Sequence, residues 1–496
     1  MSITTKIMEL ILGFLILLPV LLVLGAWIYG APDQISWGLP YNDRGYSIDL
    51  DSLGNIIVSG STTENPSQTS AFISKFDQVG NIIWSRKWAN TPTLTIHHIN
   101  IAEKVAVLKG NPQIIDYISV VGVSRLDNTT QNFKSFFLLL DPNGSLQCYW
   151  SLWDQNSNST KLYSLAEDPS PNSSIYLVGI SDYSGAIIKF DLLPTCSFSW
   201  FKIYPSPINN TRLVFRDAVF YDGSLYVVGH VIYPTGDSDL VLYKIDPSGD
   251  VINALVFEAQ RRQRGYGIDI DIFGNVILVG MGFNPSPNPD VLAIKLDNNL
   301  NFLCGSAIDT GREDIGREVA VDGYGNIHIV GYTSAGPVAA ALIVELFPDC
   351  SHIQTYRWGN ASSIGMDVKV ATGSQIQQGV YSLNLYVVGW FEGPFPNPLI
   401  VDYPNISSFT PNISIHSPTH IDGSLAFSGG VYGDISGSLN NPQQAETYIL
   451  KIYEEEPIID EFNVLYIVIM ALATATIFQF AKGWISRYLR EMVRPR

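Results

Sequence analysis

An internal repeat constrains this chain more than any other feature of its sequence. The segment RGYSIDLDSLGNIIVSG at residues 44–60 returns almost unchanged as RGYGIDIDIFGNVILVG at residues 264–280. In each copy apolar residues alternate with small or polar ones on both sides of a stretch that contains Asp, Gly and Asn. Alternation of period two predicts half-buried strands, and Asp, Gly and Asn favour a tight turn between them. Each copy therefore predicts a β-hairpin.

Weaker copies of the repeat fill the rest of the chain, and each is followed by a second hairpin-like segment. Four strands in a unit of 40–50 residues is the size of one β-propeller blade. A stacked β-solenoid is the alternative, but its coils are usually shorter and lack two hairpins each. The sequence therefore predicts an all-β fold, a single β-propeller whose blades hold four antiparallel strands. The first strands of successive blades are expected to begin near Ile48, Ile101, Ser164, Ala218, Ile268, Val319 and Val368.

The number of blades depends on how the last part of the repeat region is interpreted. HIDGSLAFSGG at residues 420–430 resembles a first hairpin and would begin an eighth blade, with TYILKIY at residues 447–453 as its third strand. Eight blades are favoured on this basis, and seven is the alternative. The fourth strand of the last blade is expected from Ile35–Gly38, at the other end of the domain. This pairing would close the ring and remove its exposed edges.

The unit IDLDSLGNIIVSGSTT, repeated as VAVDGYGNIHIVGYTS, resembles the SBBP-type β-propeller repeat of prokaryotic secreted and surface proteins. The resemblance is clearest in the first, fifth and sixth blades. It implies a propeller that acts in binding or scaffolding. It carries no set of catalytic residues, so no residue role follows from it.

Both ends of the chain contain long uncharged segments. Leu10–Ile28 and Phe462–Phe480 are each long enough to cross a bilayer, although the first could instead be a cleaved signal peptide. Lys and Arg residues after the second segment predict a cytoplasmic tail. We therefore expect residues 1–32 to form a transmembrane helix, residues 33–456 an extracellular propeller, and residues 457–496 a second transmembrane helix with a basic tail. This would be a two-pass cell-membrane protein with both termini in the cytoplasm.

The charge and the cysteines indicate the kind of surroundings the domain works in. The formal net charge is −17, which argues against nucleic acid as a partner. The four cysteines lie in or just before fourth strands, in two pairs separated by about one blade. We therefore expect the disulfides Cys148–Cys196 and Cys304–Cys350, which persist in an oxidising environment.

Asn-x-Ser/Thr sequons are frequent in the predicted loops, and they predict N-linked glycosylation. The eight candidate acceptors are Asn128, Asn143, Asn158, Asn172, Asn209, Asn360, Asn405 and Asn412.

The sequence contains no metal-binding, phosphate-binding or nucleophile motif, so we expect no cofactor, no metal site and no catalytic residues. The pairs Asp49/Asp51 and Asp269/Asp271 could suggest calcium. Because they recur at one hairpin position, stabilisation of the turn explains them better.

Two features of the sequence suggest an enzyme instead. KFDQVGNIIW at residues 75–84 is similar to the Trp-bearing motif of quinoprotein propellers, but the position of its Trp holds Cys148, Asn253 and Cys304 in other blades. A hydrolase with its site in the central funnel is the other possibility, because several arginines precede first strands and can face the axis. These are Arg44, Arg216, Arg264 and Arg317.

The function expected from these features is that of an interaction or scaffold module. It would serve the cell envelope, or act as an accessory subunit of a membrane complex. The expected partners are other envelope or membrane proteins and, through the two helices, the lipid bilayer. The alternative is an ectoenzyme, either a hydrolase or a quinoprotein-like enzyme, with its site in the funnel.

Overall fold

The computed structural model describes residues 33–455 except for the segments 38–41, 66–67, 90–97, 109–115, 126–132, 169–172, 193–195, 259–260, 284–287, 335–338, 359–361, 372–381, 393–398, 403–404, 409–411, 417, 423–424, 429–430 and 435–445. In this part of the chain every regular element is a β-strand.

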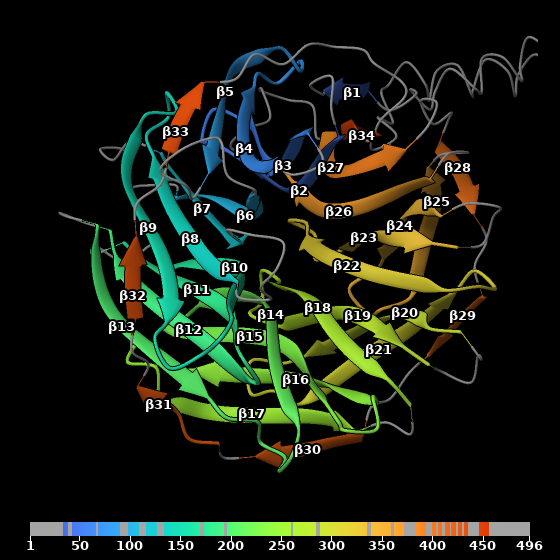
Figure 1. The fold of residues 1–496 in the computed structure, drawn as a ribbon. Helices are drawn as coiled ribbons and strands as arrows, with labels where there is room; N and C mark the ends of the chain where they lie inside the picture. Colours follow the sequence, from blue (N-terminus) through green and yellow to red (C-terminus); the bar gives the residue numbers. More distant parts are fainter. Residues whose placement is uncertain are drawn as a thin grey trace, which may run out of the picture. The chain divides into compact units, whose positions relative to one another are not determined.

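The strands form blades arranged in a ring around a central axis (Figure 1). Successive strands of a blade pair antiparallel, and the first strand of each blade is the innermost. The first three blades comprise β2 (Asn42–Leu50), β3 (Ile56–Asn65), β4 (Gln68–Phe76) and β5 (Ile82–Ala89); β6 (His98–Leu108), β7 (Tyr117–Arg125), β8 (Lys134–Leu140) and β9 (Leu146–Asp154); and β10 (Thr160–Asp168), β11 (Ser174–Ser181), β12 (Ser184–Asp191) and β13 (Ser197–Tyr204).

The next three blades have the same order. They comprise β14 (Arg212–Tyr221), β15 (Ser224–Ile232), β16 (Ser238–Ile245) and β17 (Val251–Glu258); β18 (Gln263–Ile270), β19 (Val276–Gly282), β20 (Asp290–Leu296) and β21 (Phe302–Asp309); and β22 (Asp314–Val321), β23 (Ile327–Thr333), β24 (Ala340–Leu346) and β25 (His352–Trp358). The last blade is built differently, from β26 (Ser362–Val370), β27 (Ser382–Glu392), β34 (Glu446–Glu455) and β1 (Asp33–Trp37).

The described residues therefore make seven blades, and the eight blades favoured from the sequence are wrong. The seven expected first strands are present, since the predicted positions lie in β2, β6, β10, β14, β18, β22 and β26, but each strand begins three to six residues before the predicted start. The error lies in residues 420–430, which do not begin a blade. They contribute two short strands to blades far away in the sequence. TYILKIY belongs to β34 and is the third strand of the seventh blade.

The ring closes through the pairing of its two ends. In the seventh blade β1 lies antiparallel to β34, and the register runs from Asp33 opposite Lys451 to Trp37 opposite Thr447. The predicted closure by the amino-terminal strand is confirmed, although the blade that it completes is the seventh.

Hydrophobic residues gather between neighbouring blades rather than in one central core. One buried cluster joins each pair of adjacent blades around the ring. The seventh and first blades share such a cluster, in which Tyr386 and Val388 pack with Ile48, Val58 and Phe72. Every sheet therefore buries both of its faces, which explains the nearly continuous apolar strands such as IYLVG and LYVVG.

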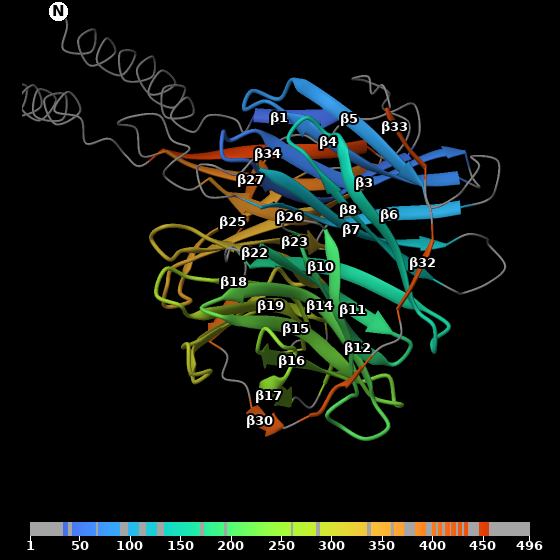
Figure 2. The same ribbon diagram turned by 90° about the vertical axis from the view of Figure 1, so that its left-hand side faces the viewer.

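A segment inserted between β27 and β34 circles the outside of the ring. We call residues 399–434 the belt. Its six short strands are β28 (Leu399–Asp402), β29 (Asn405–Ser408), β30 (Asn412–His416), β31 (Ile421–Asp422), β32 (Leu425–Ser428) and β33 (Val431–Asp434). They add one antiparallel strand to the outer edges of the sixth, fifth, fourth, third, second and first blades, in that order (Figures 1 and 2).

Proline explains why the first three belt strands are so short. Pro404, Pro411 and Pro418 stand between successive strands of the belt in the sequence. Proline has no backbone N–H, and it cannot continue a ladder of hydrogen bonds. The belt therefore pairs with one blade for a few residues and then passes to the next. It covers edges that would otherwise present unpaired backbone groups.

The flanking transmembrane helices and the two-pass membrane topology expected from the sequence are not supported. No helix long and apolar enough to cross a membrane occurs in the residues that the structure describes. The segments 10–28 and 462–480, on which the expectation rested, lie outside those residues. The expectation was based on the hydropathy of these segments and on the basic residues after the second one. The part of the chain that the structure describes is all-β and folds into separate sheets.

Both expected disulfides are present. Cys148 pairs with Cys196 and Cys304 with Cys350, with Cα–Cα distances of 6.5 and 6.0 Å. Each joins a fourth strand to the connection that precedes the fourth strand of the next blade. In the first and third blades a tryptophan occupies the position of Cys148 and Cys304 and links its blade to the next. The Trp84 indole N–H donates to Pro142 O at 3.1 Å, and that of Trp200 to Pro247 O at 3.2 Å.

Candidate functional site: the axial channel

Each inner strand contains a β-bulge at the same position. In the first blade the register shifts between Gly45 and Ser47, and the other six blades repeat this shift. A bulge places one extra residue on the strand and re-aims its side chain. The extra residues are Tyr46, Glu103, Tyr163, Arg216, Tyr266, Arg317 and Met366, and all of them line one cavity of about 100 Å³ on the axis.

The strand opposite each bulge requires glycine. A Cβ on Gly60 would lie 2.0 Å from Arg44 O, and a Cβ on Gly280 would lie 1.8 Å from Arg264 O. No side chain fits at such distances. The recurrent Val-x-Gly at the end of the sequence repeat therefore belongs to the architecture of the channel.

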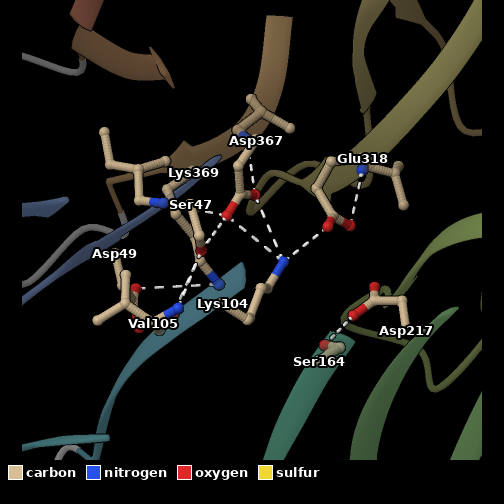
Figure 3. Close-up of polar contacts among 12 residues, drawn as sticks. Ser47, Asp49, Lys104, Val105, Ser164, Asp217, Glu318, Asp367 and Lys369 are labelled. Atoms are coloured by element: carbon tan, nitrogen blue, oxygen red, sulfur yellow. Dashed lines mark hydrogen bonds and ion pairs between the residues drawn. The ribbon is translucent and has the colours of Figure 1, made fainter. Parts of the chain in front are cut away.

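The residues directly after the bulges form a narrow layer that we call the waist. Its members are Ser47, Lys104, Ser164, Asp217, Gly267, Glu318 and Asp367. Lys104 extends from the second blade to the opposite side of the ring (Figure 3). Its Nζ lies 2.6 Å from Glu318 Oε2 and 3.4 Å from Asp367 Oδ2. One cation thus links the second blade with the sixth and the seventh.

Carboxylates at and below the waist connect neighbouring inner strands. Asp367 accepts the N–H of Ile48 at 3.0 Å and the hydroxyl of Ser47 at 2.5 Å. Asp49 accepts the N–H of Val107 at 2.8 Å.

The same arrangement recurs on the other side of the ring. Asp217 accepts the N–H of Ile268 at 3.0 Å, and Asp269 accepts that of Val321 at 2.8 Å. In the four contacts to a backbone N–H, a carboxylate of one blade bonds the inner strand of the next blade. These acids therefore hold the ring together around a cavity of about 460 Å³.

Burial and mutual charge govern the titration of this cluster. Burial alone would lower the pKa of the Lys104 ammonium, but Asp367 and Glu318 outweigh it and hold that pKa well above its ordinary value. Burial and the nearby Asp217 raise the pKa of the Glu318 carboxyl. Lys104 is therefore a cation that is held by the acids around it.

The layer of bulge residues has the opposite character. The Arg216 guanidinium lies 4.6 Å from the ring centre of Tyr163 and 5.9 Å from that of Tyr266. Arg317 lies 5.7 Å from the rings of Tyr266 and Tyr332. Cations and aromatic rings thus alternate around the axis at the end where the inner strands begin.

Two further cations extend this end of the channel. Lys161 Nζ lies 3.7 Å from the ring centre of Phe133, and Arg212 lies 5.8 Å from that of Tyr183. Burial, together with the charges of Arg212 and Arg216, lowers the pKa of Lys161. We call Lys161, Arg212, Arg216 and Arg317 the basic mouth.

The arginines singled out from the sequence divide into two groups. Arg216 and Arg317 line the axial cavity, as expected. Arg44 instead pairs with Glu392 at 3.0 Å and covers the ring of Trp390 at 4.4 Å, while Arg264 Nε donates to Ser238 Oγ at 3.3 Å.

Sequence reasoning missed Lys104, Glu318, Asp217 and Asp367, as well as Glu103 in the mouth. None belongs to a motif, and their contacts join inner strands that are far apart in the sequence. What these residues share in the sequence is a fixed position relative to the bulge of their inner strand. That position can be recognised only when the seven repeats are aligned on the glycine of the second strand, which lies opposite the bulge.

Of the four aspartates considered for calcium, Asp51 and Asp271 stabilise turns, whereas Asp49 and Asp269 bond the inner strand of the next blade. Asp51 accepts the N–H groups of Leu53 at 3.0 Å and Asn55 at 2.8 Å, and it pairs with Lys75 at 2.8 Å. Asp271 has the same role in the fifth blade. The interpretation as turn stabilisation is therefore confirmed for Asp51 and Asp271, but not for Asp49 and Asp269.

The structure places the candidate glycosylation sites but does not test their occupancy. Asn143, Asn158 and Asn209 are exposed in turns and loops, and Asn405 and Asn412 stand in the belt. Asn128, Asn172 and Asn360 lie outside the described residues. Glycosylation remains a prediction.

Residues 306–337 match a family profile described as a β-propeller repeat. The match covers the end of β21 and the first hairpin of the sixth blade, and it agrees with the geometry described above. This chain is a β-propeller protein. No protein with a curated description matches it.

Similar solved structures include Sqt1 from Chaetomium thermophilum, with 12% identity, 74% of this chain and 89% of that chain covered, and a TM-score of 0.41. Another is the polysaccharide lyase Uly1, with 11% identity, 82% of this chain and 89% of that chain covered, and a TM-score of 0.42. No role for this propeller is drawn from either.

Proposed function

We propose that this propeller is a binding module whose protein partner docks at the end of the channel that carries the basic mouth. One observation carries the proposal. Among the described residues no carboxylate forms an ion pair with Lys161, Arg212, Arg216 or Arg317, although all four side chains are partly buried. Charges held partly away from water without a counterion are costly in an isolated protein, and they favour a ligand that supplies the missing charge.

The alternative hypothesis, an enzyme with its active site in the funnel, has less support than a binding module. Asp49, Asp217, Asp269 and Asp367 each accept a backbone N–H from the next blade, and Lys104 pairs with Glu318. A general acid or base needs a proton that it can exchange with substrate. These groups are committed to holding the ring closed, which favours binding over catalysis.

Site-specific photo-crosslinking tests the proposal. Tyr183 is 72% exposed beside Arg212, and Tyr324 is 57% exposed on the turn between β22 and β23, where the inner strands end. Each is replaced by a photoreactive benzoylphenylalanine in the full chain, expressed in its native cells. We expect a discrete crosslinked partner from position 183 and none from position 324. Equal labelling from both positions, or none from position 183, would remove the basis of the proposal.

A further inference from the structure

The basic mouth contains unmet hydrogen-bond donors as well as unpaired charge. The Nε atoms of Arg212, Arg216 and Arg317 are buried and have no hydrogen-bond partner. Buried donors are nearly always satisfied in folded proteins, so three such groups at one end of a channel call for an explanation. A ligand with several acceptor oxygens that enters the axial cavity would meet the guanidinium groups of Arg216 and Arg317, which line it.

The only acid among the bulge residues does not balance these cations. Glu103 lies close enough to Arg216, Arg317 and Lys161 for their charges to act on its carboxyl. It offers one carboxylate against four cations. The mouth therefore keeps a net positive charge within a chain whose formal net charge is −17.

The shape of the donors indicates carboxylate. A guanidinium presents its N–H groups in a planar fork that matches a carboxylate bidentately. The axial cavity between Arg216 and Arg317 is about 100 Å³, which suits one side-chain carboxylate rather than a whole small molecule of drug size. Arg212 and Lys161 are placed to meet further acidic groups of the same ligand.

The aromatic rings of the mouth favour a peptide over a nucleic acid. Single-stranded nucleic acids bind to protein by stacking their bases on aromatic faces. Here Tyr163, Tyr266 and Phe133 already have a cation against the ring, at 3.7–5.9 Å. The rings hold the cations in place, and recognition falls to the charges.

We infer that the basic mouth binds an acidic peptide segment, with one Asp or Glu side chain seated between Arg216 and Arg317 and others on Arg212 and Lys161. The inference rests on the proposed function, since it names the chemistry of the partner that docks there.

Binding of a fluorescent poly-glutamate peptide to the full chain tests the inference. Arg216→Gln and Arg317→Gln, alone and combined, are compared with Lys244→Gln. Lys244 also covers an aromatic ring, Tyr226 at 5.0 Å, but it lies on β16 away from the mouth. We expect each arginine change to weaken binding about tenfold or more, because a hydrogen bond to a charged group is lost. Lys244→Gln should bind like the unchanged chain, and binding should weaken with added salt.

Three results would overturn the inference. They are absence of poly-glutamate binding, binding that the double variant leaves unchanged, and tighter binding of polygalacturonate or single-stranded DNA than of the peptide. Thermal unfolding of each variant separates loss of the site from loss of the fold, and Arg212→Gln, at the edge of the mouth, gives a second test if the axial variants fold poorly. Should crosslinking at position 183 succeed while poly-glutamate fails, the proposed function stands and the acidic peptide does not.

Discussion

Lys104 and Glu318 form an ion pair across the propeller, with Nζ 2.6 Å from Oε2. Only 14% and 11% of their side chains are exposed. Since Lys104 belongs to the second blade and Glu318 to the sixth, this pair connects parts of the ring that share no sheet. Asp367 of the seventh blade completes the contact at 3.4 Å.

Replacing Lys104 by Met should destabilise the protein by about 3–5 kcal/mol, because two buried carboxylates then lose their counterion. Denaturant unfolding measures the change. Lys244→Met is the matched control, with an expected loss below about 1 kcal/mol. The double variant Lys104→Met/Glu318→Gln should recover part of the stability. A loss below about 1 kcal/mol for Lys104→Met would mean that the ion pairs of Lys104 do not stabilise the folded protein.

Glu103 should make the protein less stable as the pH rises. Burial raises the pKa of its carboxyl to about 7 from an ordinary 4.5. Between these values the folded state binds more protons than the unfolded state, so stability falls through this window with increasing pH. Glu103→Gln removes the effect. The variant should match the parent chain at about pH 4 and exceed its melting temperature at about pH 8. The exposed Glu258→Gln is the control, and parallel pH profiles of all three chains would contradict the assignment.

Removal of β1 should weaken the whole ring. A chain that starts at residue 41 and ends at residue 456 lacks the strand that pairs with β34, and it leaves that edge open. We expect it to unfold at a lower temperature than a chain that starts at Ala31, as followed by circular dichroism. Equal melting temperatures would show that the ring closes without its amino-terminal strand.

The two disulfides should stabilise the contacts between the neighbouring blades that they link. Labelling of the denatured, unreduced protein should find no free thiol, since all four cysteines are paired. Changing both Cys304 and Cys350 to Ser should cost about 4 kcal/mol in the loop-entropy account. The Cys148/Cys196 bond stays as an internal control. Four reactive thiols in the unreduced protein would refute both bonds.

Deleting the belt should change solubility more than local folding. Joining β27 to β34 by a short linker leaves the blades intact but exposes six outer edges. Exposed edges pair with other chains, so we expect oligomers in light scattering while circular dichroism keeps its β-sheet signal. A linker variant that retains β28–β30 should give an intermediate result. A monomeric beltless protein would show that the outer edges are protected in another way.

The comparison of sequence with structure shows where local patterns suffice. Hairpins, inner strands and the pairing of Ile35 with Ile449 follow from alternation and turn residues, because these act over a few neighbours. The belt does not. Ile421 resembles the start of a hairpin, yet it pairs with Ile203, and nothing near it in the sequence marks that partner. The role of Lys104 could not be predicted for the same reason, since it depends on Glu318 and Asp367, which reach the axis only when the ring is closed.

The belt also bears on how such a protein can change in evolution. Propellers built from repeats gain or lose blades when a repeat is duplicated or deleted. Here each blade from the first to the sixth has its own belt strand, and the belt meets the blades in reverse order along the chain. An added blade would need a second insertion at the mirrored place in the belt, or one edge would stay bare and every later belt strand would meet the wrong partner. Two coordinated events are far rarer than one, so the belt fixes the copy number of the repeat.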